Sequence, residues 1–357
     1  MNVRRTVRAG VLAGALIATA VAAVPMPSIA ATPGPADPIP RTAAPTPRSA
    51  GSIDDPAGGP ALPTTSSTTV DPSNAAAFWT PARLSGARPL EVTPARPTGD
   101  SPRFTPSTTA AGGVPPLDPA SATVSSAFDP VAEPEAPANR ISGAIFVALA
   151  GGEGVARCSG TSVSAGNRSL VITAGHCVYE GHGRWLAGKW VFIPGYHDGV
   201  RPFGVFPAKW LGTTRIWQRE GSENGDVGAA VVGRNERGEL LADAVGAAGI
   251  AWGLPPQQSF DVHGYPAAPP YNGSSQRLCA ATPYLGHDFG SFLWTGPLNL
   301  AVECPVSGGA SGGGWLINGN TINSVTDYGY GEDSATDYGA YFGDAVRDLY
   351  KRAAKVK

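Results

Sequence analysis

The sequence is poor in charge: only 15% of its 357 residues are charged, and the formal net charge is −2. A protein that binds nucleic acid through the phosphates needs a strongly positive balance, so we expect no nucleic-acid partner. Coiled coils and helical bundles need charge-rich helix formers, whereas this chain combines low charge with 47 glycines. The composition therefore argues against both of these helical classes.

Long apolar runs are also missing. The run from Val11 to Val24 holds 14 residues without a charge, which is short of the roughly 20 that span a bilayer. Arg4, Arg5 and Arg8 precede it, and Ser28-Ile29-Ala30 follows as a small-x-small cleavage pattern. This order predicts a secretory signal peptide over residues 1–30 rather than an uncleaved membrane anchor. We expect a secreted protein that does not stay in the membrane.

Proline is distributed unevenly, since 22 of the 35 prolines lie between Ala31 and Arg140. This stretch has few aromatic residues and is expected to bury too little apolar surface to offset chain entropy. The composition predicts a disordered, Pro/Ala/Ser/Thr-rich propeptide or linker over residues 31–140. A second interpretation stays open, in which the stretch is an inhibitory pro-region that docks through Phe78-Trp79. A folded domain is expected over residues 141–357.

Cysteine is scarce, and its four copies all lie in the second part of the chain, at Cys158, Cys177, Cys279 and Cys304. An even number behind a signal peptide favours two disulfides, for which three pairings exist. The local pairing, Cys158–Cys177 and Cys279–Cys304, closes loops of moderate size. The chain has no C-x-x-C and no H-E-x-x-H motif, so no metal site is expected.

From Ile141 onward, short apolar runs alternate with Gly, Pro and Asn, which is typical of an all-β sandwich or barrel. The runs cover residues 141–149, 170–173, 189–194, 227–232, 298–302 and 315–325. Within the last run, Asn318-Gly319-Asn320 predicts a hairpin turn. The tail predicts a helix that Asp344 caps.

Ser311 is the candidate nucleophile. It lies between Gly309 and Gly312-Gly313, flanked by two apolar runs, where a flexible Gly/Ser linker is not expected. Glycines allow the backbone amides to point toward the oxyanion that forms when a serine attacks a carbonyl. Ser307 also precedes two glycines, but it lacks a glycine two residues before it and ranks second.

His176 is the candidate base, and Asp226 is the candidate carboxylate that orients it. His176 follows the apolar run that ends in Thr173, and a disulfide from Cys177 would hold its turn rigidly. Asp226 opens the apolar run 227–232, where a carboxylate can be shielded and aimed at an imidazole N–H. The nucleophile elbow of α/β-hydrolases would also fit the serine motif, but that fold needs a histidine after the serine. All five histidines precede Ser311, which excludes it.

Together, Thr173-Ala174-Gly175-His176-Cys177, Asp226-Val227-Gly228-Ala229-Ala230 and Gly309-Ala310-Ser311-Gly312-Gly313 resemble the motifs of secreted trypsin-like serine proteases of the chymotrypsin fold. The resemblance covers roughly Ile141 to Lys357 and is greatest to actinobacterial proteases and the glutamyl endopeptidase branch. It implies an all-β fold of two six-stranded antiparallel β-barrels with a short C-terminal helix.

The resemblance also implies a serine endopeptidase that works through an acyl-enzyme intermediate, without a cofactor. Ser311 would attack, His176 would move the proton, and Asp226 would orient the imidazole. The amides of Gly309 and Ser311 would form the oxyanion hole. We expect a monomer that acts on protein or peptide substrates, with its own pro-segment as a further partner.

Two departures from the family pattern matter. Ala310 stands where trypsin-like zymogens carry the aspartate that receives the new N-terminus. If the chain is cut between Arg140 and Ile141, we expect activation by removal of the pro-segment and not by an internal ion pair. Pro305 stands where trypsin carries its cation-selecting aspartate, so a preference for Arg or Lys is not predicted.

The strand after the serine also lacks the histidine of glutamyl enzymes and offers Asn323, Ser324 and Thr326 as a polar, uncharged wall. Two other functions stay open beside the protease. One is a non-catalytic binding protein that keeps the protease fold. The other is a cell-surface protein with residues 31–140 as a stalk, for which no anchoring signal is visible.

Overall fold

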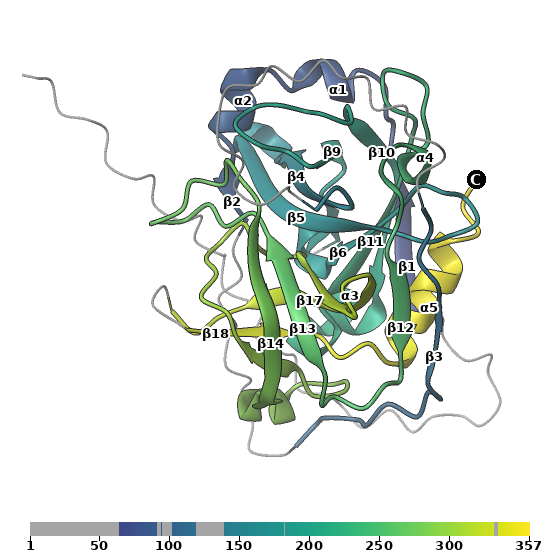
Figure 1. Ribbon diagram of the computed structural model, residues 1–357, viewed down its shortest axis with the longest axis vertical. Coiled ribbons are helices and arrows are strands. Elements are labelled where there is room, and N and C mark those ends of the chain that lie inside the picture. The colour runs from purple at the N-terminus through teal and green to yellow at the C-terminus, as the bar shows by residue number, and fades with distance from the viewer. Residues whose placement is uncertain (1–63, 91–93, 95–101, 119–138, 182, 332–334) are drawn as a thin grey trace, which may run out of the picture. The chain divides into compact units, whose positions relative to one another are not determined.

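The computed structural model describes residues 64–90, 94, 102–118, 139–181, 183–331 and 335–357 (Figure 1). All of these belong to one compact unit, Pro38–Lys357. The expected signal peptide lies outside the described residues. No helix in the described part of the chain is long and apolar enough to cross a membrane.

Six antiparallel strands close the first barrel in the order β10-β11-β6-β5-β4-β9, and β9 pairs back to β10. Their bounds are β4 Ser142–Ala148, β5 Val155–Val163, β6 Leu170–Ala174, β9 Gly188–Pro194, β10 Phe206–Thr214 and β11 Val227–Val232. The run that predicts β11 is apolar throughout because both of its faces are buried. Ala230 and Val232 pack inside the barrel, whereas Val227, Ala229 and Val231 face the cluster that joins β11 to the second half of the chain.

The second barrel also has six antiparallel strands, in the order β16-β13-β14-β15-β18-β17, and a β16–β17 pairing closes it. Their bounds are β13 Ser259–Gly264, β14 Arg277–His287, β15 Leu300–Glu303, β16 Gly314–Ile317, β17 Thr321–Tyr328 and β18 Thr336–Gly339. Phe260, Val262, Leu300 and Trp315 are among the buried residues of its core. The prediction of two six-stranded barrels is confirmed.

Short elements connect and flank the barrels. They are the strands β7 Tyr179–Gly181, β8 Arg184–Trp185 and β12 Gly249–Trp252, the helices α3 Arg215–Glu220, α4 Leu241–Val245 and α5 Asp344–Ala353, and the 3-10 turns η1 Ala150–Gly152, η2 Gly175–Cys177, η3 Glu223–Gly225 and η4 Phe289–Leu293. The expected C-terminal helix is α5, but the prediction that Asp344 caps it is wrong by one residue. Gly343 is the N-cap, and Asp344 is the first helical residue.

Part of the proline-rich stretch is structured, which differs from the disorder expected over residues 31–140. Its elements are β1 Thr65–Thr69, α1 Ala75–Phe78, α2 Pro81–Ser85, β2 Arg88–Pro89 and β3 Gly112–Val114. We refer to residues 64–90 as the strap. β1 pairs with β10, β2 with β5, and β3 with β12, so existing strands supply backbone partners for the stretch.

Large apolar side chains also anchor the strap. They are too few to change the average composition of residues 31–140, so that average does not reveal them. Trp79 is 1% exposed and Leu84 is fully buried, in a cluster with Phe146 and Ile193 of the first barrel. The Trp79 indole N–H donates to the Lys189 carbonyl at 2.7 Å. Residues 31–63, 91–93, 95–101 and 119–138 lie outside the described residues, and the expectation of disorder there stays a prediction.

Both local disulfides are present, Cys158–Cys177 and Cys279–Cys304, which settles the choice among the three pairings. The first fixes the turn that carries His176 to β5. The second joins β14 to the segment that follows β15.

Candidate active site

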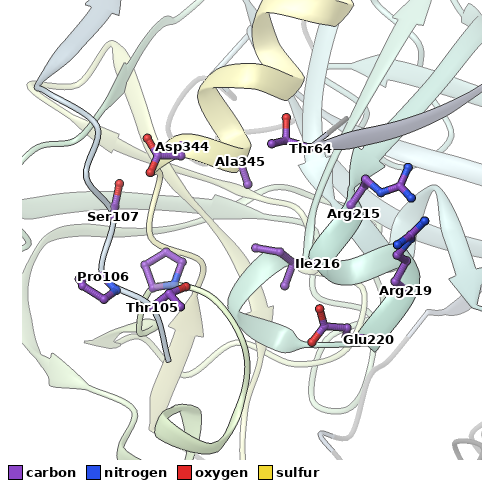
Figure 2. Close-up of a pocket in the computed structure, with 11 residues that line it drawn as sticks. Thr64, Thr105, Pro106, Ser107, Arg215, Ile216, Arg219, Glu220, Asp344 and Ala345 are labelled. Atoms are coloured by element: carbon purple, nitrogen blue, oxygen red, sulfur yellow. The ribbon is translucent and has the colours of Figure 1, made fainter. Parts of the chain in front are cut away.

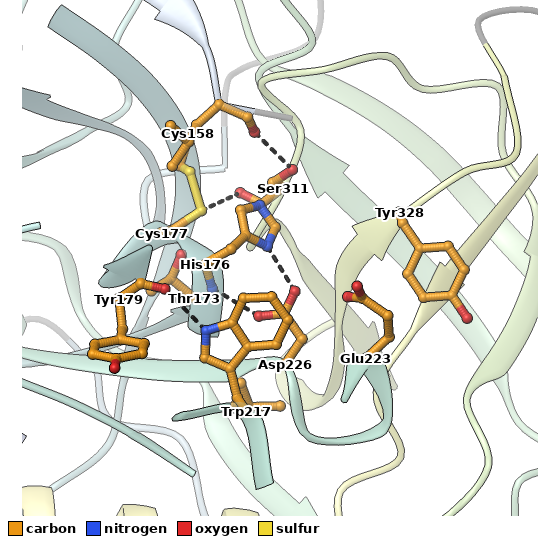
Figure 3. Close-up of polar contacts among 12 residues, drawn as sticks. Cys158, Thr173, His176, Cys177, Tyr179, Trp217, Glu223, Asp226, Ser311 and Tyr328 are labelled. Atoms are coloured by element: carbon orange, nitrogen blue, oxygen red, sulfur yellow. Dashed lines mark hydrogen bonds and ion pairs between the residues drawn. A yellow bond between two sulfur atoms is a disulfide. The ribbon is translucent and has the colours of Figure 1, made fainter. Parts of the chain in front are cut away.

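His176 and Asp226 meet because the strands next to them are paired. β6 and β11 run antiparallel with Val227 opposite Ala174, so the residue before β11 faces the turn after β6. The Asp226 carboxylate is fully buried and uses both oxygens on His176. Oδ2 lies 2.7 Å from the imidazole Nδ1, and Oδ1 accepts from the His176 backbone N–H at 2.7 Å (Figure 3).

Gly175 makes this close approach feasible. A Cβ at this position would lie 2.7 Å from Asp226 Oδ1 and 2.8 Å from the Trp217 ring. Trp217 of α3 also packs edge-on to the imidazole, with ring centroids 6.2 Å apart, and its indole N–H donates to the Tyr179 carbonyl. The hydrogen bond to Asp226 and the packing of Trp217 hold the imidazole in one orientation, with Nδ1 toward the carboxylate.

Ser311 lies in the loop before β16, beside the imidazole on the side away from Asp226 (Figure 3). Its backbone carbonyl accepts from Ser159 N at 2.8 Å and contacts Cys177 Sγ at 3.6 Å, which ties the loop to the first barrel. The Ser311 hydroxyl makes no hydrogen bond to the histidine. It donates to the Leu90 carbonyl of the strap at 3.4 Å, and the buried His176 Nε2 has no hydrogen-bond partner among the described residues.

The loop around Ser311 has the backbone that an oxyanion hole requires. Ala310 N, Gly312 N and Gly313 N all donate to backbone carbonyls, whereas in the described part of the chain neither Gly309 N nor Ser311 N has an acceptor. Gly309 has φ +95°, and a Cβ there would lie 2.8 Å from the Tyr265 carbonyl, so the turn requires glycine. Two amides in one loop without acceptors, on either side of Ala310, can bind a developing negative charge.

Ser159 braces this loop and was not found from the sequence. Its hydroxyl donates to the Gly309 carbonyl at 2.8 Å and accepts from Tyr265 N at 2.8 Å. The residue directly follows a disulfide cysteine, which was the only available signal. Ser307, the second-ranked serine, donates instead to the Ala268 carbonyl.

Two buried carboxyl groups, Asp327 of β17 and Asp337 of β18, were not predicted from the sequence. Both follow Ser311, whereas the aspartate of the motif order His, Asp, Ser lies between His176 and Ser311. Burial raises the pKa of Asp327 well above its ordinary value, and the nearby Asp226 and Glu223 charges add to the effect. Burial likewise raises the pKa of Asp337 to about 8. Its hydrogen bonds, among them the one from Thr326, lower the pKa but do not cancel the effect of burial. The Asp337 side chain is therefore expected to be mostly protonated at neutral pH.

The polar side chains expected to form a wall beside the serine are occupied within the fold. Asn323 Nδ2 donates to the Ala251 carbonyl, and Ser324 Oγ donates to the Ala340 carbonyl. Thr326, whose backbone pairs with Gly312 and Gly313, donates its hydroxyl to Asp337 Oδ2 at 2.7 Å. The hydrogen-bond partner of Thr326 is thus Asp337, an acidic residue that the sequence pattern did not indicate.

Metal binding has little support in the described residues. One group of metal-ligating side chains comes close enough together, namely Cys158, His176 and Cys177. Both sulfurs are used in the disulfide, so they cannot serve as thiolate ligands.

A separate surface pocket of about 330 Å³ is bordered by α3, by the start of α5 and by residues 105–107 of the proline-rich stretch (Figure 2). Arg215, Arg219, Glu220 and Asp344 are among its lining residues, with Thr105 and Ser107. None of the candidate catalytic residues lines it, so it does not belong to the site around His176.

Comparison with known proteins gives a mixed result. No protein-family model matches the chain, and no curated protein matches it. Solved structures do match. Protease Anisep from Arthrobacter nicotinovorans is 36% identical, with a TM-score of 0.57, and the match covers 62% of this chain and 98% of Anisep. The thermostable serine protease AL20 from an extremophilic microorganism is 31% identical, with a TM-score of 0.56 and coverage of 61% and 99%.

Proposed function

The chain belongs to the serine proteases of the chymotrypsin fold, and we propose that it is a secreted serine endopeptidase whose triad is His176, Asp226 and Ser311. One arrangement carries the proposal. A buried His–Asp pair joined at 2.7 Å lies beside a serine whose loop holds two amides without acceptors.

In the proposed reaction, Ser311 Oγ attacks the carbonyl carbon of the scissile peptide bond while His176 Nε2 takes the hydroxyl proton. The carbonyl oxygen becomes an oxyanion and accepts hydrogen bonds from Gly309 N and Ser311 N. His176 then gives its proton to the departing amine, which leaves an acyl-enzyme. Water attacks this ester by the same route and releases the acid. Asp226 keeps Nδ1 protonated and stabilises the imidazolium.

Export is part of the same proposal. The predicted signal peptide over residues 1–30 and two disulfides in the folded domain support it, because disulfides persist in oxidising compartments. Activation by removal of the pro-segment also stays a prediction. In the uncut chain, Ile141 N donates to Asn139 Oδ1 and Ala310 is buried without a charge to offer.

A serine-directed fluorophosphonate tests the proposal. We expect mass spectrometry of the treated full-length protein to find the label on Ser311, and we expect His176→Ala to abolish it, because the base that removes the proton is gone. A folded protein that stays unlabelled at Ser311 even after the segment that contacts the Ser311 hydroxyl has been displaced by substitution would instead support the non-catalytic binding protein.

A further inference from the structure

The strap ends at the candidate nucleophile. β2 adds to the edge of β5, with Arg88 opposite Ala156 and Pro89 opposite Arg157. The next residue, Leu90, donates its N–H to the Arg157 carbonyl at 3.0 Å and accepts from the Ser311 hydroxyl through its carbonyl. A residue far from the serine in sequence therefore lies directly against its hydroxyl.

This contact uncouples the serine from its base. A serine hydroxyl has one proton to donate. While that proton is directed at Leu90, it is not directed at His176 Nε2, which is buried and lacks a partner in the described residues. The His–Asp pair is fully formed, so the serine is the only one of the three groups that is out of place.

The direction of the strap differs from that of a departing product. His176 gives its proton to the leaving amine, so the leaving segment must lie on the His176 side of Ser311. The edge of β5 is on that side, because Cys158 is bonded to Cys177, the neighbour of His176. β5 runs toward Ser311, so a leaving segment that pairs with β5 and has its N-terminus at Ser311 would run outward, antiparallel to β5. β2 is parallel to β5 and runs inward toward Ser311.

We propose that the strap is a built-in inhibitor that holds the protease latent by occupying the leaving-group side of the cleft in the reverse direction. The proposal rests on the proposed function and specifies its regulation. The Leu90 carbonyl oxygen accepts from the Ser311 hydroxyl and not from the Gly309 and Ser311 amides, so this carbonyl is not held for attack and the strap blocks the site without being cut there. Release requires loss of the β2–β5 pairing or of the anchors at Trp79 and Leu84.

The rate of fluorophosphonate labelling at Ser311 in the full-length chain tests latency. Leu90→Pro removes the N–H that donates to the backbone carbonyl of Arg157. Trp79→Ala removes the buried side chain that anchors the strap to the first barrel. We expect each to label at least tenfold faster than the unmodified chain. Ala77→Ser, at an exposed position of α1 two residues before Trp79, is the control and should keep the slow rate. Circular dichroism checks that each variant is folded.

The outcomes separate the two proposals. If the unmodified chain labels as fast as folded Leu90→Pro, the strap does not inhibit, although the protease function stands. If folded Leu90→Pro never labels at Ser311, the protease function fails and latency fails with it. Reversed binding predicts an intact Leu90–Glu91 bond after prolonged incubation. A cut there that is absent from Ser311→Ala would show that the strap binds as a substrate and would overturn the reversed geometry.

Discussion

The two barrels hold their catalytic candidates in different ways. The first barrel presents His176 and Asp226 at the ends of two paired strands, joined by two hydrogen bonds and covered by Trp217. The second presents Ser311 on a loop that depends on Ser159 of the first barrel for its brace and on the strap for the partner of its hydroxyl. The His176–Asp226 pair is therefore already assembled, whereas the hydroxyl of Ser311 is hydrogen-bonded to the strap and not to the histidine.

Breaking the His176–Asp226 pair should have the largest effect. Asp226→Asn keeps the shape but removes the charge that fixes the imidazole tautomer, so we expect kcat/KM on a peptide substrate to fall by about 10⁴. The measurement uses the Leu90→Pro chain, in which the strap does not limit the rate. Asp198→Asn, at the exposed turn aspartate, is the control and should leave kcat/KM unchanged. A loss of less than tenfold in Asp226→Asn would contradict the assignment.

Breaking the brace between the barrels should have a smaller effect. Ser159→Ala leaves the Gly309 carbonyl and Tyr265 N without their partner, which should let the oxyanion loop shift. In the Leu90→Pro chain we expect kcat to fall by roughly 10- to 100-fold with KM little changed, since one amide donor contributes about this much or more.

Ser162→Ala is the matched control for the brace. Ser162 lies on the same strand, is equally buried, and donates to the Gly246 carbonyl at 2.8 Å. Both variants should lose about 1–3 kcal/mol of unfolding free energy. Only Ser159→Ala should lose turnover, and an equal loss of turnover in the two variants would reduce Ser159 to a purely structural residue.

Asp337, a buried acid of the second barrel, should affect the stability of the fold and not the rate of the reaction. The pKa of Asp337 is raised to about 8 by burial, from 3.8 when exposed, so the folded state holds a proton that the unfolded state loses. This contribution to stability is complete below about pH 4 and is lost as the pH rises through about 8, with a slope of up to about 1.4 kcal/mol per pH unit.

Asp337→Asn removes the titrating proton, and urea unfolding across this pH range checks the result. The unfolding free energy of the unmodified chain should fall with rising pH relative to that of the variant. Asp198→Asn should follow the unmodified chain. Parallel curves for Asp337→Asn and the unmodified chain would show that Asp337 is ionised in the fold.

Much of the fold could be predicted from local patterns. β11 matches the apolar run 227–232 residue for residue, and the Asn318-Gly319-Asn320 turn connects β16 to β17 as expected. β14 could not be found in this way, because most of its residues are partly or fully exposed and show no apolar alternation. The meeting of His176 with Asp226 followed from motif order, whereas Asp327 and Asp337 belong to no local motif and enter the site only through barrel closure.

The strap shows most clearly what composition misses. Averaged over residues 31–140, the content of proline and small residues predicts disorder, yet Trp79 and Leu84 bury completely or almost completely. Their stability depends on a surface that residues of the first barrel create, and no local sequence pattern reports that surface. A composition average is therefore a poor guide where a few large side chains are concentrated.

The first strand of the strap is fastened partly to the last helix of the chain. Thr64 Oγ1 donates to Asp348 of α5, and Arg352 of α5 donates to Ser67. The paired residues lie 284 and 285 positions apart in the sequence, so these links form only after α5 has been synthesised. A chain truncated before Asp348 would keep the pairing of β1 with β10 but would lose these two side-chain links between the strap and α5.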